Sequence, residues 1–582
     1  MSIIVNYCAI RELAQIDEII RTEKIPYTFR VCPMNPILAY HERSKHRLDR
    51  YAPGPGGLDW ESQPDPFRRY FGCPTVDLPL LTGELPVCWD DLFGPAGIPE
   101  QSIGMVTLAN LLQLSFGLSA WKTSGDSRWA LRCNPSSGNL HPTEAYLVCP
   151  DLPGLPAGIY HYRPDMHCFE QRASAPLSWS GGVLLTLASI PWREAWKYGL
   201  RAFRYCQHDC GHALAALSYA AATLGWQATL LTDWADADLA ALIGVDRKEE
   251  FPVGEDEVPE ALVWIGPGVA PPMSEVMVMM TGARWAGRPN VLSPYHHDWP
   301  EITVVVAETR KPCITPTPTD IRPPLPDLAL VSCKPVSHLI RGRRSAQAFD
   351  GFTSIGDQTF FRMLDALLPR VCQPPWSLLN DAPRVHPVLF VHRVDGLTPG
   401  IYCMPRASSA LGGLRAAMRP DWLWARVGGC PKHLPLYLLA PMDMRTFAAT
   451  VSCHQSIAAD SAFSLAMLAR FDDVGPDRPW MYRQCFWEAG MLGQALYLEA
   501  EAAGVQGTGI GCYFDDEVHR RLGINTTNFQ DIYHFTVGTA VVDMRLRTLE
   551  PYAHLPTRGR SMPSPHSPYL QTSISSSTTS LK

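Results

Sequence analysis

The sequence predicts an α+β fold in which one unit occurs twice in a single chain. Two observations support this prediction. Short blocks containing glycine recur in the same order at regular spacing along the 582 residues. An apolar, helix-like stretch also accompanies two of these blocks in both copies. Recurrence at a fixed spacing is the sequence signature of an internal repeat.

The first repeated block precedes a predicted helix. Ser102-Ile103-Gly104 recurs as Ser354-Ile355-Gly356, 252 residues later. Apolar side chains follow each block in matching positions at helical spacing. They are Thr107, Leu108, Leu111 and Leu112 in copy one, and Thr359, Phe360, Met363 and Leu364 in copy two.

Two further blocks follow in the same order. Gly158-Ile159-Tyr160 recurs as Gly400-Ile401-Tyr402, 242 residues later. Three glycines then recur at one offset of 279: Gly211, Gly225 and Gly244 become Gly490, Gly504 and Gly523. Between the first two glycines of each set, an Ala/Leu-rich stretch predicts a helix that the second glycine can cap (HALAALSYAAATLG and MLGQALYLEAEAAG). Three ordered blocks indicate a duplication.

The repeats divide the chain into five predicted segments. Residues 1–99 form an N-terminal extension and leader to copy one, which covers 100–268. Residues 269–334 are Pro-rich apart from a β-branched run at Ile302 to Val306, and are predicted to be a linker to copy two at 335–550. The Ser/Thr-rich tail, 558–582, has little to bury and is predicted to be disordered.

The composition excludes several function classes. A net charge of −7 without a dense Lys/Arg run argues against a nucleic-acid partner. No apolar stretch is long enough for a membrane helix, and charged residues interrupt the N-terminus where a signal peptide needs an apolar core. The 17 cysteines include no Cys-x-x-Cys pair and are expected to be reduced thiols. We therefore predict a cytoplasmic protein.

One Cys/His cluster has the residue types of a zinc site but the wrong spacing. On a helix, Cys206 and Cys210 share one face, whereas His208 and His212 share another. Four ligands in this arrangement cannot converge on one ion, so no metal is predicted.

A polar loop occurs in copy one alone. Residues 132–146 read RCNPSSGNLHPTEAY, in which Asn134, Ser136, Ser137 and Asn139 are packed around Pro135 and Gly138. So many short hydrogen-bonding side chains indicate a binding loop for a polar ligand, although Arg132 is its only cation. The counterpart in copy two, APRVHPVLFV, contains no serine and no asparagine.

Copy two has what this loop lacks. Its RGRRSAQAF stretch places Arg341, Arg343, Arg344 and Ser345 ahead of a predicted helix, an arrangement that suits a phosphate dianion. The 252-residue offset aligns Arg343–Ser345 with Asp91–Phe93 of copy one, where an aspartate would repel a phosphate.

A Gly-rich loop and two further arginines are also confined to copy two. Gly507-Thr508-Gly509-Ile510-Gly511 lets backbone N–H groups approach a ligand closely. The 279-residue offset aligns it with Ala228–Thr232, which lacks glycine. The end of copy two, VGTAVVDMRLR, adds Arg545 and Arg547. Each copy therefore carries what the other lacks, which predicts one composite site.

These elements resemble the nitroreductase-like flavoproteins, and among them the SagB/ThcOx-type dehydrogenases, whose azoline-oxidising members form azole rings in peptides. The resemblance covers roughly 100–268 and 335–550, and YHERSKHRLDRYAPGPGGLDW (40–60) resembles the leader of two-copy members. In this family two chains form a dimer and FMN lies in the interface. The resemblance implies a nitroreductase-like fold, with an intramolecular pseudo-dimer in place of the dimer and with one FMN site retained.

The resemblance also implies which residues bind FMN and from which copy they come. Pro135, Ser136, Ser137 and Asn139 come from copy one. Copy two supplies Arg343, Arg344, Ser345, Gly509, Ile510, Gly511 and Arg545 or Arg547. By the family pattern, the Gly511 N–H lies at flavin N5.

The stretch WREAWKYGLRAFRYCQHDCGH (192–212) carries the resemblance to the SagB-type branch most specifically. Members of this branch have a Lys-Tyr pair ahead of an Arg-x-x-Arg-Tyr segment, and the pair is implicated in removing the substrate proton. The matching residues are Lys197 and Tyr198, which we assign as the catalytic pair. A fused two-copy chain without a leader-peptide-binding domain departs from the single-copy azoline dehydrogenases.

The resulting prediction is an FMN-dependent oxidoreductase that exchanges a hydride with an organic substrate. The leading substrate is a heterocycle or peptide, oxidised as in the SagB/ThcOx branch. Two alternatives stay open: a nitro or quinone reductase that uses NAD(P)H, and a non-catalytic flavin-binding or scaffold protein. The expected partners are a small-molecule or peptide substrate, with neither nucleic acid nor membrane. The expected state is a monomer, as a pseudo-dimer, or a weak homo-oligomer.

Overall fold

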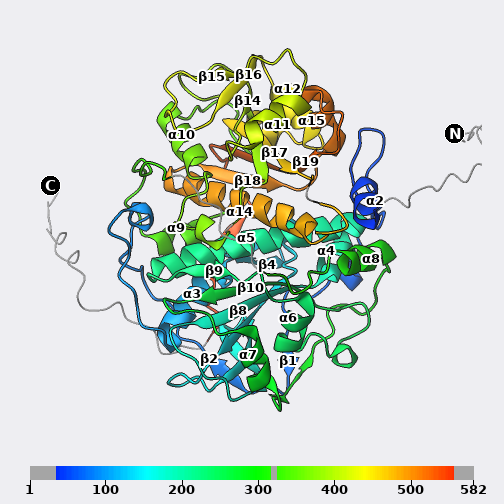
Figure 1. Cartoon of the computed structure of the whole chain (residues 1–582), viewed down its shortest axis with the longest axis vertical. Helices are drawn as coiled ribbons and strands as arrows, with labels where there is room; N and C mark the ends of the chain where they lie inside the picture. The colour runs from blue at the N-terminus through cyan, green and yellow to red at the C-terminus, as the bar shows by residue number, and fades with distance from the viewer. Residues whose placement is uncertain (1–34, 316–323, 380, 473, 556–582) are drawn as a thin grey trace, which may run out of the picture.

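The computed structural model describes residues 35–315, 324–379, 381–472 and 474–555. Each of two lobes contains one large sheet, and two long helices run between the lobes (Figure 1). In that view copy one builds the lower lobe and copy two builds the upper lobe. Within the described residues, no helix combines the length and apolar character needed to cross a membrane.

The sheet of copy one has the strand order β11-β7-β6-β5-β8-β10-β9, with β2 pairing β7 as well. Its central strands are buried on both faces, because their sequences are nearly continuous apolar runs. The strands are β2 (Thr75–Asp77), β5 (Thr143–Cys149), β6 (Gly158–Arg163), β7 (Cys168–Ser174), β8 (Val183–Ser189), β9 (Ala228–Leu230), β10 (Val258–Ile265) and β11 (Arg284–Trp285).

The sheet of copy two repeats this order as β15-β16-β14-β13-β17-β19-β18. From the second strand onward, each member has the chain position of its counterpart in copy one, and every pairing is antiparallel. The strands are β13 (Val385–Val391), β14 (Gly400–Cys403), β15 (Ala425–Arg426), β16 (Tyr437–Pro441), β17 (Phe463–Arg470), β18 (Gln506–Ile510) and β19 (Phe529–Gly538).

The lobes meet through two helices of 22 residues each, α5 (Ala202–Thr223) and α14 (Met481–Ala502). They cross at Gly211 and Gly490, two glycines of the 279-residue repeat. A Cβ at Gly211 would run into the Trp487 carbonyl oxygen, and one at Gly490 into the His208 carbonyl oxygen. Equivalent glycines therefore face each other across the crossing, which makes the chain an internal pseudo-dimer.

The other repeated glycines also have equivalent places. Gly244 ends α6 (Asp236–Ile243) and Gly523 ends α15 (Asp515–Leu522), with φ of 74° and 77°. Both adopt the left-handed conformation that favours glycine at a helix end. Gly225 and Gly504, which follow α5 and α14, have φ of 74° and 79°. These positions confirm the offsets found in the sequence.

The two predicted helices after the Ser-Ile-Gly blocks are α3 (Met105–Ser115) and α10 (Asp357–Asp365). The basic cluster does not precede a helix as predicted. Instead Arg343 is the C-cap of α9 (Val336–Gly342), and the chain continues without a helix until α10. The apolar residues Val336, Leu339 and Ile340 are buried and explain why the helix forms before the arginines.

The Pro-rich segment is more than a linker. It contains α7 (Met273–Met280), the edge strand β11, and α8 (Pro300–Glu308), which lies against α2 and α5. The β-branched run therefore belongs to a helix. Pro300 at the first helical position and the burial of Ile302 and Val305 explain this outcome, because tertiary packing overrides β propensity.

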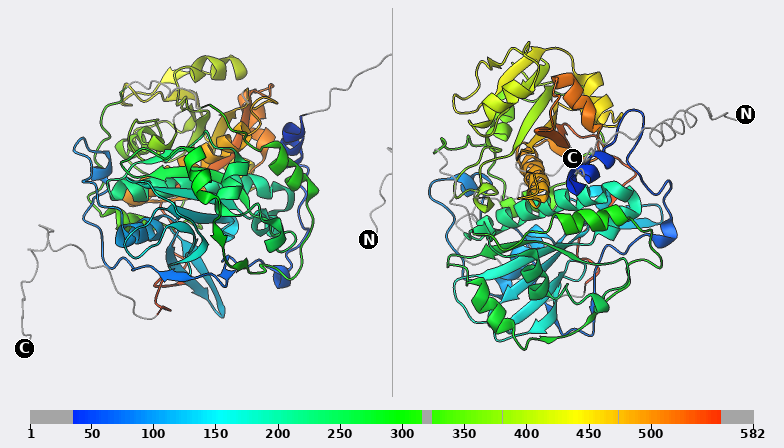
Figure 2. Two further views of the ribbon diagram at one scale, coloured as in Figure 1. Left: turned by 60° about the horizontal axis from the view of Figure 1, so that its bottom comes forward. Right: turned by 45° about the vertical axis from the view of Figure 1, so that its right-hand side comes forward.

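The N-terminal extension lies along both lobes. Its helix α2 (Pro36–Arg43) begins at Asn35, whose side chain accepts from Ile37 N–H. Further on, η1 (Trp60–Ser62) precedes β1 (Tyr70–Phe71), which pairs with β12 (Arg288–Pro289), and β2, which joins the copy-one sheet. Figure 2 shows the extension as the blue chain along the side of the molecule. Residues 1–34 lie outside the described residues.

The end of copy two returns to copy one. Strand β20 (Arg547–Leu549) pairs with β3 (Leu118–Ser124), which pairs with β4 (Ser127–Arg132). The predicted disordered tail lies outside the described residues. Copy two also contains α11 (Ala410–Ala417), α12 (Arg445–Val451) and α13 (Ile457–Asp460), which cover the outer side of its sheet (Figure 1).

Candidate functional site

The polar loop forms a compact turn before β5. Gly138 and Asn139 have positive φ of 59° and 60° inside the short η3 turn (Ser137–Asn139). Ser136 Oγ accepts from the His141 N–H at 2.8 Å, and Asn139 Nδ2 donates to the Ala130 carbonyl at 2.9 Å. The side chains therefore fix the loop, while Pro135 is half-buried within it.

Asp209 on α5 holds this loop. Its carboxylate accepts from the Ser137 N–H at 3.0 and 3.1 Å and from Ser137 Oγ at 3.0 Å. Burial raises the pKa of this carboxyl to about 7 despite these bonds. Asp209 was not among the predicted site residues. It lies within 192–212, and its place two residues before Gly211, the glycine of the helix crossing, could have indicated it.

The arginines of copy two reach this same loop. Arg343, which is 4% exposed, donates to the carbonyls of Cys133 and Arg132 at 3.3 and 3.2 Å. Arg344 donates to the Ser119 carbonyl at 3.1 Å. Burial and the neighbouring Arg343 lower the pKa of Arg344. Two cations thus lie together at the junction of the copies.

Tyr497 on α14 connects the serine and the Gly-rich loop. Its hydroxyl lies 2.8 Å from Ser345 Oγ and accepts from the Gly509 N–H at 3.0 Å. The Arg343 guanidinium lies over its ring, 4.9 Å from the centroid. One side chain therefore contacts both the Arg343–Ser345 group and the Gly-rich loop, although the sequence did not single it out.

The two histidines of the Cys/His cluster turn toward copy two. His212 Nε2 lies 3.0 Å from the Tyr533 hydroxyl, and His208 Nε2 lies 2.9 Å from the Ile532 carbonyl oxygen. The His208 ring stacks on Tyr533 with centroids 4.2 Å apart. These histidines therefore bind the helix α5 to strand β19.

The last glycine of the Gly-rich loop, Gly511, faces copy one. A Cβ at Gly511 would run into the Tyr205 ring, and the Tyr205 hydroxyl donates to the Gly511 carbonyl at 2.9 Å. Arg201 also donates to this carbonyl, at 3.2 and 3.3 Å. The intervening Ile510 is buried in the core of copy two. Tyr205 and Arg201 belong to the Arg-x-x-Arg-Tyr segment, which thus contacts the loop of the other copy.

Lys197 and Tyr198 lie against the tip of the polar loop, at the end of α4 (Pro191–Tyr198). A Cβ at Gly138 would come 2.5 Å from the Tyr198 hydroxyl and 3.1 Å from Lys197 Nζ. The Tyr198 and Tyr205 rings are 4.5 Å apart. The predicted catalytic pair therefore lies between the polar loop and the residue that contacts Gly511.

A carboxyl group that the sequence analysis missed lies behind this pair. Glu194 is buried on α4, and neither of its carboxyl oxygens has a hydrogen-bond partner within the described chain. Burial, and next the neighbouring Asp209, raise its pKa well above the usual range. Burial likewise raises the pKa of Tyr198, with Glu194 as the next cause. Burial therefore favours the neutral form of Glu194, and Tyr198 is protonated near neutral pH.

The two C-terminal arginines do not join these residues. Arg545 is exposed and forms an ion pair with Asp543 at 2.8 Å. Arg547 is exposed on β20, opposite Thr123 of copy one. Although both arginines follow β19 in the chain, neither side chain lies with the other predicted site residues.

The position that is pseudo-equivalent to the composite site, by the 279-residue offset, contains a cavity of about 270 Å³. Leu230 at the end of β9 and Thr232 just beyond it line the cavity; they are the counterparts of Gly509 and Gly511. The loop before β13 also lines it, as does Glu488, the counterpart of Asp209. Glu488 accepts from the Arg384 N–H at 3.0 Å and pairs with Arg406.

The residues of the composite site fit a flavin mononucleotide. Within the described chain, Arg343 and Arg344 have no carboxylate at ion-pair distance, and their side chains donate mainly to backbone carbonyls. The neighbouring carboxylate is Glu501, which accepts from the Arg344 N–H at 3.1 Å. Two guanidinium groups with no carboxylate at ion-pair distance can bind an anion such as a phosphate. Among the described residues, Asn134 Oδ1 is buried without a hydrogen-bond partner. Tyr533 and Tyr205 pack directly on Gly509 and Gly511, where a Cβ would run into them.

The comparison with solved structures identifies the fold as nitroreductase-like. A protein assigned as a nitroreductase from Anabaena variabilis matches with a TM-score of 0.63 at 21% identity, covering 87% of this chain and all of that chain. Smaller shares match the E. coli microcin synthetase McbBCD complex with truncated pro-MccB17 bound (19% identity, 31% of this chain and 71% of that chain, TM-score 0.24). A protein assigned as a nitroreductase in complex with FMN, from Exiguobacterium sibiricum, matches at 13% identity (36% and 90%, TM-score 0.21). No protein-family model and no curated protein matches the sequence.

Proposed function

We propose that this protein is an FMN-dependent oxidoreductase with one composite flavin site between two fused copies, at 100–268 and 335–550. The observation that carries the proposal is the convergence at the helix crossing. Elements that are about 200 residues apart in sequence, the polar loop and the Arg343-Arg344-Ser345 group, lie in direct contact there. Neither copy contains both elements, which is the arrangement expected of a dimer interface site kept in one chain.

Each predicted part of the composite site has one proposed role. Arg343, Arg344 and Ser345 would hold the phosphate, and the Gly509–Gly511 backbone would supply an N–H to the reactive edge of the ring. The polar loop would contribute contacts from copy one. When bound, FMN accepts or donates a hydride. Arg545 and Arg547 are not needed for this assignment, because both are exposed.

We infer that the reaction is the dehydrogenation of a heterocycle or a peptide-like substrate. Such a reaction removes a hydride from carbon and a proton from the neighbouring atom. The Lys197–Tyr198 pair lies at the tip of the polar loop, where a base can take this proton. Tyr198 is a protonated donor at neutral pH, so Lys197 is assigned as the acceptor.

The test is a direct comparison of two reactions by the FMN-loaded protein. A model thiazoline peptide should be oxidised while the flavin is reduced. Reduction is followed as the loss of the flavin absorbance at about 450 nm. Reduction of a nitroaromatic or a quinone by NAD(P)H, without oxidation of the thiazoline, would favour the reductase alternative. Flavin binding without either reaction would favour a non-catalytic protein.

A further inference from the structure

Segment 51–60 of the N-terminal extension passes beside the proposed catalytic pair at the end of α4. Trp196, the residue before the pair, is buried against Trp60 of this segment, with the two ring centroids 5.5 Å apart. Trp196 Nε1 also donates to the Asp59 carbonyl at 2.9 Å. The end of the segment is therefore held against the last turn of the helix that carries the pair.

The start of the segment contacts the other side of the pair. The Leu200 N–H donates to the Pro53 carbonyl at 3.0 Å. Gly199, the residue after the pair, has a positive φ of 53°, and a Cβ there would come 2.6 Å from the Gly54 Cα. The segment thus contacts the residues on both sides of the pair, and the pair itself stays half-buried.

Hydrogen bonds fix both ends of the segment. The Tyr295 hydroxyl donates to Asp59 Oδ2 at 2.5 Å, and the Glu61 N–H donates to Asp59 Oδ1 at 3.1 Å. At the other end, the Ala52 N–H donates to His46 Nδ1 at 2.9 Å. The segment is therefore a wall with a fixed position beside the pair.

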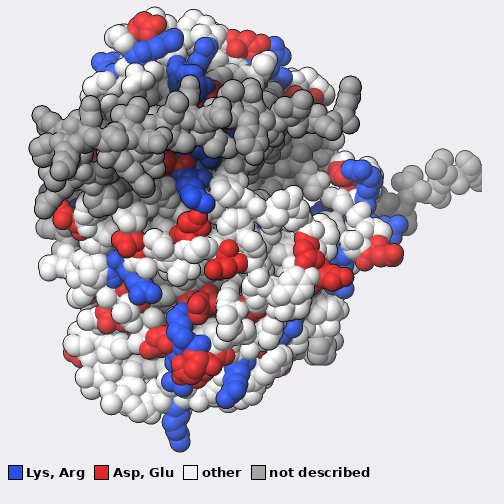
Figure 3. Space-filling model, turned by 90° about the vertical axis from the view of Figure 1, so that its right-hand side faces the viewer, with Lys and Arg blue, Asp and Glu red and all other residues white. Residues whose placement is uncertain are grey.

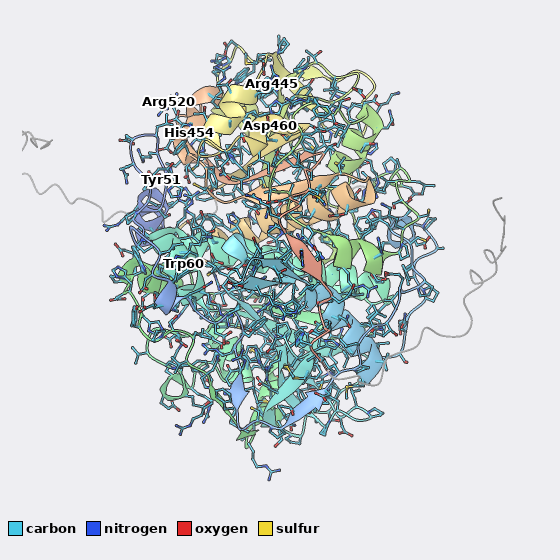
Figure 4. The ribbon with its side chains drawn as sticks, turned by 180° about the vertical axis from the view of Figure 1, so that it is seen from behind. Tyr51, Trp60, Arg445, His454, Asp460 and Arg520 are labelled. Carbon is cyan, nitrogen blue, oxygen red and sulfur yellow. The ribbon has the colours of Figure 1, made fainter. Side chains whose placement is uncertain are left out.

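Two aromatic side chains of this wall are open to solvent. Trp60 is 67% exposed and Tyr51 is 57% exposed, and Tyr51 packs its ring 5.9 Å from Phe514 of copy two. Figure 4 shows Tyr51 and Trp60 along the same edge of the molecule. Figure 3 looks onto this edge and shows side chains of both charges interspersed with uncharged ones. Aromatic surface, rather than a net charge, therefore distinguishes the wall.

We propose that segment 51–60 is the substrate-binding wall beside the catalytic pair, and that Trp60 and Tyr51 bind a large apolar or aromatic side chain next to the ring that is oxidised. The proposal rests on the proposed function and narrows the substrate to peptides of this class. Trp and Tyr supply large, rigid apolar surface together with an N–H or O–H group that can donate to a peptide carbonyl. The wall reaches past both neighbours of the pair, so it meets residues that flank the ring, which a peptide has and a free heterocycle lacks.

The first test measures binding without turnover. Two fluorescent thiazole peptides, which are already oxidised, differ only in a Phe or a Gly next to the ring. Fluorescence anisotropy gives their dissociation constants for the full FMN-loaded chain. Wild type should bind the Phe peptide about tenfold more tightly or better, because burial of an aromatic side chain contributes at least that much. Trp60→Ala should bind the two peptides with similar affinity.

Two further variants control this comparison. Phe71→Ala removes an aromatic side chain of similar exposure, 64%, elsewhere in the extension, and should keep the preference for the Phe peptide. Tyr51→Ala leaves the contact between Trp60 and Trp196 in place and should reduce the preference. Equal binding of the two peptides by wild type, or a preference that neither Trp60→Ala nor Tyr51→Ala changes, would overturn the wall.

The second test separates the wall from the proposed reaction. With the matching thiazoline peptide as substrate, Trp60→Ala should raise KM about tenfold and change kcat little, because the contact is the same in the ground state and the transition state. Lys197→Ala should lower kcat instead. Oxidation with the same KM in wild type and Trp60→Ala would overturn the wall and leave the proposed function standing. Binding that depends on Trp60, without oxidation, would support the wall as a peptide site and overturn the proposed reaction.

Discussion

In each of the two pseudo-equivalent sites, a helix carboxylate accepts a hydrogen bond from a loop N–H, but only one of the two carboxylates has an ion-pair partner. In the composite site, Asp209 accepts from the N–H of the polar loop, and in the other site Glu488 accepts from the N–H of Arg384 in the corresponding loop. Glu488 is paired with Arg406, whereas Asp209 has no cation at ion-pair distance within the described chain. The carboxyl at one site is therefore neutralised by the protein, and the one at the other site holds a proton near neutral pH.

The side chains around the two carboxyl groups also differ between the two sites. Where α14 has Tyr497, which joins Ser345 to Gly509, the aligned position of α5 has Ser218. Gly509 and Gly511 of the Gly-rich loop align with Leu230 and Thr232, which line the cavity of the other site. The duplicated packing is therefore present in both copies, whereas the groups that we propose to bind the FMN phosphate occur on one side alone.

The largest expected effect concerns the catalytic pair. Lys197→Ala should lower dehydrogenation by about 10²–10⁴-fold, because general acid–base help is typically of that size. Reduction of a nitro group or quinone, which can take protons from water, should be nearly unchanged. Steady-state rates of both reactions give the answer, and Arg478→Ala, at the exposed rim of the other site, is the matched control. An equal loss of both activities would make Lys197 a structural residue.

The second-largest expected effect is a loss of FMN affinity when the proposed phosphate-binding arginines are removed. Replacing Arg343 and Arg344 by Ala should weaken FMN binding by about a hundredfold or more, since hydrogen bonds to charged groups contribute roughly 1.5–3 kcal/mol each. Fluorescence titration of the apoprotein measures the dissociation constant. Arg384→Ala, beside the second cavity, should leave it unchanged. If the double variant binds FMN like wild type, the phosphate lies elsewhere.

Asp209 predicts a dependence of stability on pH. Its pKa rises from 3.8 in the unfolded chain to about 7 in the folded one. Between these values the folded state holds the extra proton, so stability falls as the pH rises, by roughly 2–4 kcal/mol. Asp209→Asn should remove this slope while keeping an acceptor for Ser137. Thermal unfolding from pH 4.5 to 7.5 measures it, and Glu488→Gln should keep the wild-type slope.

The smallest expected effect is that of one hydroxyl group. Tyr497→Phe should weaken FMN binding by about 3–10-fold, because a single hydrogen bond contributes about 0.5–1.5 kcal/mol. The same titration measures it, with Ser218→Ala as the counterpart in copy one. A variant that binds as tightly as wild type would show that Tyr497 does not position Ser345 and Gly509.

Much of the fold was predictable because the repeat is recorded in glycines. Gly211 and Gly490 are required by the close crossing of the long helices, and Gly244 and Gly523 by left-handed helix ends. Because both situations favour glycine, the sequence shows these positions directly. The Pro-rich segment was harder, because its helix α8 forms through the burial of Ile302 and Val305 against distant elements, and a local pattern does not contain that information.

The residues of the candidate site either lie in short sequence motifs or are positioned by packing. The structure brings the polar loop, Arg343 and the Gly-rich loop close together, and their binding of FMN stays a prediction. Asp209 and Tyr497 were missed, because a polar side chain on an Ala/Leu-rich helix has no local signature of its partner in the other copy. Arg545 was predicted from the end of copy two, but it pairs with Asp543 at the surface.

The central claim is that two copies make one flavin site. The most direct measurement is the ratio of FMN to protein after reconstitution with excess FMN, from flavin absorbance and quantitative amino-acid analysis. The account predicts close to one FMN per chain, bound where Arg343 and Arg344 meet the polar loop. A ratio near two would mean that the cavity lined by Leu230 and Glu488 also binds flavin, and a ratio near zero would mean that neither site does; either result would contradict the account.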